Sequence, residues 1–167
     1  GVVSTADDPQ GRPTVVDLVP TEPRVWPVGR LDADSEGLIL VSNDGDLTHH
    51  VTHPSNRVTK TYVVQVSGNP GKAALRRLVE GVELDDGPAQ AVSARRLEMS
   101  GGRALLELVM SEGRNREVRR MCDAVGHPVL RLARSAIGPI SDPSLQPGTW
   151  RLLTPHEVAA LYRYGRP

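Results

Sequence analysis

The stretch VGRLDADSEGLILVSNDGD, residues 28–46, decides which fold this chain is expected to adopt. It joins a charged loop to GLILVS at 37–42, an almost uninterrupted apolar run of the length of a buried strand. A loop anchored by such a strand can hold a carboxylate rigidly at a domain surface, as an active site requires. An ordinary solvated turn with capping residues uses the same residue types, so both interpretations stand at this point.

On both sides of this stretch the pattern contains more strands than helices. Strands are expected at residues 25–29, 58–67, 89–98, 103–111, 127–135 and 148–153. Helices are expected after a cap at Asp44 or Asp46, over 71–80 with Gly81 as the stop, over 118–125, and from Pro155 behind the cap Thr154. The sequence therefore predicts one α+β domain over residues 1–167, with a mainly antiparallel mixed sheet and flanking helices.

The composition is that of a globular protein, with 38% hydrophobic and 24% charged residues. The single cysteine, Cys122, excludes a disulfide within the chain and favours a reducing compartment, with the cytoplasm as the default. No apolar run is long enough to span a membrane. Phe is absent, and two Trp and three Tyr are too few for a platform of stacked rings under a nucleic acid.

Positive charge in this chain is concentrated rather than abundant. Twenty basic residues balance twenty acidic ones, which counts against a general nucleic-acid binder. Six arginines nevertheless lie within one short window: Arg114, Arg116, Arg119, Arg120, Arg131 and Arg134. Several of them fall opposite the apolar stripe of the helix expected over 118–125, where a solvated face and a phosphate-binding face look alike.

Metal binding is a weak interpretation of the acidic segment. Asp32 and Asp34 open like a calcium loop, but Asn43 occupies the position where that loop needs a bidentate Glu. His49 and His53 are spaced to share one helix face, but neither an HExxH nor a CxxC pattern accompanies them. No metal and no cofactor are therefore expected.

Three segments, in this order, resemble the motifs of the RsuA/RluB group of ribosomal RNA pseudouridine synthases, and within it most the RluB type. They are GRLDADSEGLILVSNDG at 29–45, KTYVVQVSG at 60–68, and EGRNREVRRM at 112–121 followed by VLRLARSAIG at 129–138. The resemblance spans nearly the whole chain and implies the pseudouridine synthase fold. The S4 RNA-binding domain and the Lys-Pro strand that precede this part in the family are not found in residues 1–167, so weak RNA binding is expected.

The resemblance also implies roles for individual side chains. Asp32 would be the catalytic carboxylate and Arg119 its cationic partner, which a helix can present as a rigid fork. Tyr62 would lie against the target base, with Leu132 as the opposite apolar wall, and Arg30 would help to displace the base or hold a phosphate. Candidate phosphate contacts are Lys60, Arg114, Arg116, Arg120, Arg131 and Arg134. Cys122 is expected to pack in the core.

The activity implied is the isomerisation of uridine to pseudouridine in ribosomal RNA of the large subunit. The partner would be an RNA stem-loop or a preribosomal particle, and the protein is expected to be a cytoplasmic monomer. A non-catalytic RNA-binding or ribosome-assembly module of the same fold is the alternative. A glycosidase that uses Asp32 and Glu36 is a more distant one, because a basic helix without an aromatic sugar platform argues against it. Four positions across a loop do not define the separation between the two carboxylates.

Overall fold

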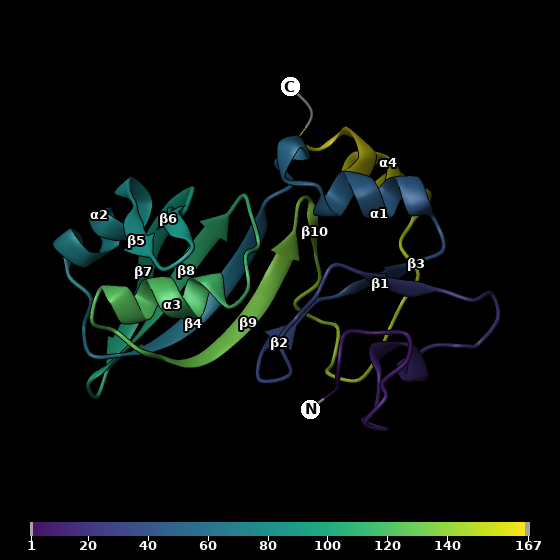
Figure 1. The fold of residues 1–167 in the computed structure, drawn as a ribbon, viewed down its shortest axis with the longest axis horizontal. Coiled ribbons are helices and arrows are strands. Elements are labelled where there is room, and N and C mark those ends of the chain that lie inside the picture. Colours follow the sequence, from purple (N-terminus) through teal and green to yellow (C-terminus); the bar gives the residue numbers. More distant parts are fainter. Residues whose placement is uncertain (1, 166–167) are drawn as a thin grey trace. The chain divides into compact units, whose positions relative to one another are not determined.

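The computed structural model describes residues 2–165, which form two compact units (Figure 1). Unit 1 contains the residues up to Val58 and those from Ser135 onward, and unit 2 contains Thr59–Arg134. Helices and antiparallel strands are both present, so the predicted α+β class is confirmed. The prediction of one domain over residues 1–167 stays a prediction. None of the described helices is long and apolar enough to cross a membrane.

Unit 2 is built on a sheet whose neighbouring strands come from distant parts of its sequence. The strands follow the order β9 (Val129–Ile137), β4 (Lys60–Ser67), β8 (Arg103–Met110) and β7 (Ser93–Ser100). The β4–β8 and β7–β8 pairs are antiparallel, and Tyr62 lies opposite Leu108. Alternate residues of β8 are buried, as expected for a sheet with one covered face. β9 continues beyond unit 2 and ends in unit 1.

Two helices cover that face of the sheet, α2 (Lys72–Glu80) and α3 (Glu117–Ala124) (Figure 1). Leu78 of α2 and Met121 of α3 are fully buried in the same apolar core as Leu108. α2 ends before Gly81, whose φ of 125° is open to glycine and costly for other residues, so the predicted stop is confirmed. Cys122 also lies in this core, and burial raises the pKa of its thiol to about 12.

The strand expected at 89–98 begins later than the sequence predicts. Residues 82–89 form a separate hairpin of β5 (Val82–Leu84) and β6 (Gly87–Ala89), closed by a turn at Asp85 and Asp86. β7 starts only at Ser93. The physical reason is the turn sequence Asp85-Asp86-Gly87, which closes one strand pair before the next begins.

Unit 1 holds its own core between short elements. These are β1 (Trp26–Val28), β2 (Glu36–Gly37), β3 (Leu40–Ser42), α1 (Gly45–Thr52), β10 (Ile140–Ser141), α4 (Pro155–Arg163), and the 3-10 turns at Val15–Leu18 and Pro54–Asn56. Val28, Val51 and Leu161 are among its buried core residues. The Asp44 side chain accepts hydrogen bonds from the backbone N–H groups of Asp46 and Leu47, so the predicted cap of α1 is confirmed.

The apolar run GLILVS is not the single buried strand that the sequence predicts. β2 ends at Gly37, whose φ is 109°, and β3 begins only at Leu40. Leu38 and Leu40 pack against the unit 1 core, but all three residues of β3 are only half-buried. β3 belongs to a two-stranded sheet with β1. An apolar run does not by itself distinguish such a strand from a central one.

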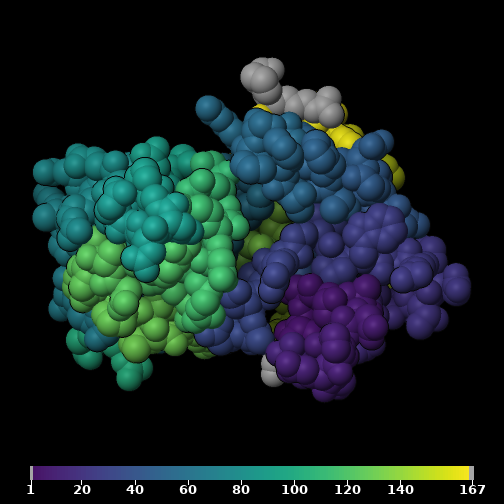
Figure 2. Space-filling model, in the orientation of Figure 1, coloured from purple at the N-terminus to yellow at the C-terminus, as the bar shows by residue number. Residues whose placement is uncertain are grey.

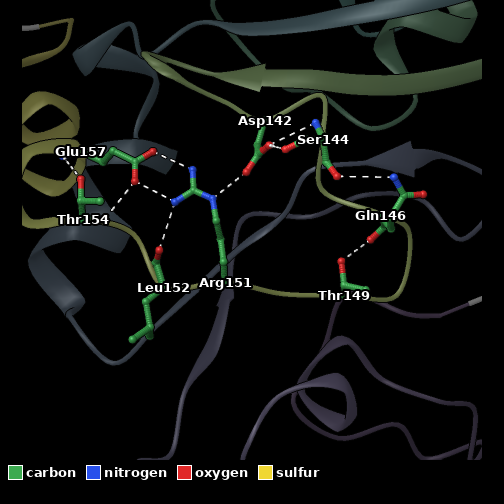
Figure 3. Close-up of polar contacts among 8 residues, drawn as sticks. All are labelled: Asp142, Ser144, Gln146, Thr149, Arg151, Leu152, Thr154 and Glu157. Atoms are coloured by element: carbon green, nitrogen blue, oxygen red, sulfur yellow. Dashed lines mark hydrogen bonds and ion pairs between the residues drawn. The ribbon is translucent and has the colours of Figure 1, made fainter.

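Residues 148–153 form no strand, although the sequence predicts one, and side chains organise this segment instead (Figure 3). Arg151 donates from Nε to Asp142 at 2.7 Å and from both Nη atoms to Glu157 at 2.8 Å. The hydrogen bonds that Glu157 accepts, first from Arg151 and then from the Thr154 backbone, lower the pKa of its carboxyl to about 2. Thr154 and Glu157 form a capping box at the start of α4, which confirms the predicted cap. The segment is therefore held by charged groups rather than by backbone pairing.

Candidate active site

The loop that carries Asp32 is fixed through its backbone. It leaves β1 at Gly29, whose φ of 80° turns the chain away from the strand. The Ser4 hydroxyl accepts a hydrogen bond from the Leu31 N–H and donates one to the Leu31 carbonyl, both at 3.0 Å. The Ser35 N–H donates to the Asp32 carbonyl at 2.9 Å and closes a turn. Asp32 is half-buried on this rigid loop, and Arg30 is exposed beside it.

A second group of candidate residues lies in unit 2 on two adjacent strands. Lys60 and Tyr62 are two positions apart on β4, so both side chains lie on its covered face. Leu132 and Arg134 are placed in the same way on β9. Leu132 and Arg134 are each 5% exposed, and Tyr62 packs against the core. Burial lowers the pKa of the Arg134 guanidinium, and its electrostatic interaction with the nearby Tyr62 side chain opposes that shift. Arg134 is therefore a buried cation close to Tyr62 within unit 2.

The electrostatics of this group distinguish Lys60 from an ordinary surface lysine. Burial lowers the pKa of the Lys60 ammonium to about 8, and the positive charge of Arg134 adds to the shift. Such an amine loses its charge as the pH rises from about 7 to 9, whereas a solvated lysine keeps its charge to about pH 10. The positive charge of Lys60 therefore depends on pH within the range in which enzymes work.

The arginines predicted from the third motif have different surroundings. Arg119 is half-buried on α3, and Arg116 is exposed just before that helix. Arg131 is exposed on β9 and, by strand alternation, faces away from Leu132. Arg114 and Arg120 form hydrogen bonds with the β5–β6 hairpin. The pairing of Asp32 with Arg119 and Tyr62 joins residues of different units and stays a prediction.

Glu117 is a residue that the sequence reasoning missed. It is 3% exposed at the first position of α3, and its Oε2 accepts a hydrogen bond from Arg114 Nε at 2.9 Å. Burial, assisted by Glu112, raises the pKa of its carboxyl to about 7. The signal was present in the helical spacing, because position 117 lies four residues before Met121 on the apolar stripe.

Among residues 2–165, no three His, Cys, Asp or Glu side chains are grouped as a metal site requires. His49 and His53, the spaced pair considered for zinc, lie with their ring centroids 4.9 Å apart and are both exposed.

These features of fold and motif are those of a known class of RNA-modifying enzymes. The model of the RNA pseudouridylate synthase family matches residues 2–124, and the chain belongs to this family. Together with the relatives named below, this match confirms the resemblance to RsuA/RluB-type synthases.

Individual relatives agree with that assignment. The chain is 41% identical over 164 residues to the ribosomal large subunit pseudouridine synthase B of Bacillus subtilis (strain 168), covering 96% of this chain and 67% of the relative. It is 47% identical over 145 residues to the ribosomal large subunit pseudouridine synthase E of Xanthomonas campestris pv. campestris, covering 78% of each. A crystal structure of a pseudouridylate synthase matches with a TM-score of 0.84 and 32% identity, over 96% of this chain and 69% of that one. The chain spans about two thirds of the length of several curated relatives, for example 66% of one from Mycobacterium tuberculosis (strain ATCC 25618 / H37Rv).

Proposed function

We propose that this protein isomerises uridine to pseudouridine in ribosomal RNA of the large subunit, with Asp32 as its essential carboxylate. The observation that carries the proposal is the match to two synthases named for the large ribosomal subunit, at 41% and 47% identity. The first motif supplies Asp32 on a loop held by Ser4 and by its own turn. A pre-organised carboxylate of this kind is what the chemistry requires.

The reaction is an internal rearrangement. The bond from C1′ of the ribose to N1 of the base breaks, the base turns, a bond from C1′ to C5 forms, and the proton from C5 is replaced by one on N1. Atoms and electrons balance without an oxidant or reductant, so no cofactor is required. The target base must first leave its stack, at a cost of a few kcal/mol.

Asp32 has two roles that suit this chemistry, attack on the sugar as a nucleophile or removal of a proton from it. Both need the ionised carboxylate, which the Arg119 guanidinium would stabilise through a charge-assisted hydrogen bond. Tyr62 would lie against the displaced base, with Leu132 as the second wall. The burial of Leu132, and the position of Tyr62 beside the buried Arg134 and against the unit 2 core, support these assignments.

Charge is unevenly divided between the units, which supports an RNA contact through unit 2. Unit 2 contains 13 of the 20 basic residues but only nine of the 20 acidic ones. Unit 2 is therefore basic, although the net charge of the whole chain is zero. We assign the phosphate contacts to Lys60 and Arg116 in unit 2 and to Arg30 in unit 1, because phosphate neutralisation dominates RNA affinity.

The Lys60 assignment predicts a pH dependence of binding. The ammonium is charged below its pKa of about 8 and neutral above it, so RNA affinity should fall as the pH rises from 7 to 9. Lys60→Arg should remove this decline, because guanidinium stays charged. In wild type the salt dependence of binding should also weaken at pH 9, with a slope smaller by about 0.9. Fluorescence anisotropy at fixed ionic strength measures both quantities. Lys72→Arg, at an exposed position at the start of α2, is the control and should keep the wild-type pH profile. A flat wild-type profile contradicts the assignment.

The function itself is tested by mapping pseudouridines in ribosomal RNA. Cells that lack the protein should lose pseudouridine at one or a few positions of the large-subunit RNA, and wild-type protein should restore them. An unchanged map contradicts the proposal. Altered ribosome assembly with an unchanged map supports the alternative, a non-catalytic RNA-binding module. We place the protein in the cytoplasm as a monomer, and size-exclusion chromatography with light scattering tests the oligomeric state.

A further inference from the structure

A group of charged side chains ties the start of α3 to the β5–β6 hairpin. Arg114 donates from Nε to Glu117 at 2.9 Å, from Nη1 to the Asp86 carbonyl at 3.0 Å, and from Nη2 to the Pro88 carbonyl at 2.9 Å. Each nitrogen of the guanidinium is therefore already bound within unit 2. The chain between Asp86 and Arg114 is long, so these contacts fix two distant segments to each other.

Arg120 makes a second connection between the same segments. Its two Nη atoms donate to the two carboxylate oxygens of Asp86 at 2.7 and 3.1 Å, and its Nε donates to the Asn115 carbonyl at 3.0 Å. This paired geometry is the strongest that arginine forms with a carboxylate. The hydrogen bond from Arg120 also lowers the pKa of Asp86 and keeps that carboxylate charged. We call Asp86, Arg114, Glu117 and Arg120 the α3 latch.

The latch acts at the start of a short helix, where the buried Val118 also packs in the unit 2 core. α3 has eight residues, and its N-cap residue Arg116 provides no side-chain cap. Figure 2 shows the β5–β6 hairpin in teal and α3 in green adjoining at the surface of unit 2, in agreement with the contact between β5 and α3. Glu117 is buried beneath this surface at 3% exposure. The latch and the core packing of Val118 therefore both hold the first turn of α3.

We propose that the α3 latch positions Arg119 for the reaction, and that Arg114 and Arg120 are positioning residues rather than phosphate contacts. The inference rests on the proposed function, in which Arg119 supports Asp32. Arg119 follows Glu117 by two residues and precedes Arg120 by one, so a shift of the helix start moves it directly. A phosphate could bind Arg114 or Arg120 only by replacing several hydrogen bonds within unit 2. A positioning role is consistent with these bonds, and a misplaced Arg119 would lower the reaction rate steeply.

Asp86→Asn distinguishes the two roles because they predict opposite results. If the latch positions α3, kcat falls by roughly 10-fold to 100-fold while KM for the RNA is little changed. If Arg120 binds phosphate instead, loss of the competing carboxylate frees its guanidinium, so the RNA binds more tightly and the salt dependence steepens by about 0.7–0.9 for the added contact. Asp85→Asn removes the neighbouring acid of the same turn and is the matched control, with near wild-type kinetics expected. Tighter binding by Asp86→Asn with unchanged kcat overturns the proposal.

Arg120→Lys is the second variant and keeps the charge while removing the paired geometry. The latch predicts that it lowers kcat as Asp86→Asn does, whereas a phosphate contact would survive the change. Hydrogen exchange of the α3 amides provides a readout independent of activity. Faster exchange in α3, with β4 and β8 unchanged, is expected for both variants; unchanged exchange in α3 contradicts the latch. If wild-type protein forms no pseudouridine but α3 still loosens in these variants, the proposed function fails while the latch stands.

Discussion

Asp32→Asn is expected to abolish pseudouridine formation, with kcat falling by roughly 10⁴-fold or more. The amide has nearly the size of the carboxylate, but it can neither attack the ribose nor accept a proton from it at neutral pH. The loop should keep its shape, because its hydrogen bonds run through the Asp32 carbonyl and through Leu31 with Ser4. A loss of this size therefore reports chemistry rather than folding.

The measurement is single-turnover conversion of a ribosomal RNA fragment, followed by mass spectrometry of its nucleosides. Circular dichroism and the melting temperature of Asp32→Asn should match those of wild type. Asp34→Asn, an exposed acid on the same loop, is the control and should retain full activity. Substantial conversion by Asp32→Asn contradicts the assignment of the carboxylate, whatever the other residues do.

Leu108→Ala should give the largest loss of stability, about 2–5 kcal/mol of unfolding free energy. Leu108 is 0% exposed at the centre of the unit 2 core, on the strand that pairs with β4. Truncation removes buried methyl groups and leaves a cavity that the surrounding sheet and helices cannot fill completely. Because Leu108 lies opposite Tyr62, the cavity also opens beside a proposed base-binding residue.

Urea unfolding followed by fluorescence or circular dichroism measures this effect. Leu130→Ala is the matched control, since Leu130 is 48% exposed on β9 in the same unit, and it should cost less than about 0.5 kcal/mol. Equal destabilisation by the two variants contradicts the burial of Leu108 in the unit 2 core. The activity of Leu108→Ala, measured below its melting temperature, should also fall if Tyr62 depends on this support.

Local signals predicted the helices well. Asp44, Gly81 and Thr154 each determine a helix end within a few residues of themselves, and all three act where the sequence places them. The motifs likewise identified the family from the order of their residues. The strands were predicted less well, because the run at 37–42 and the segment at 148–153 depend on partners far away in the chain.

In the candidate site too, some features depend on near neighbours in the sequence and others on distant segments. The sequence by itself determined that Asp32 lies on a loop between two strands, that Lys60 and Tyr62 lie on one strand, and that Arg119 lies on a helix, since each depends on near neighbours. Only the tertiary structure decided which arginines form hydrogen bonds with distant parts of the chain. Spacing does not reveal that Arg114 binds the backbone at Asp86, 28 residues earlier, or that Glu117 is buried beside it. Burial and charge pairing depend on which distant segments meet, and the folded chain alone brings them together.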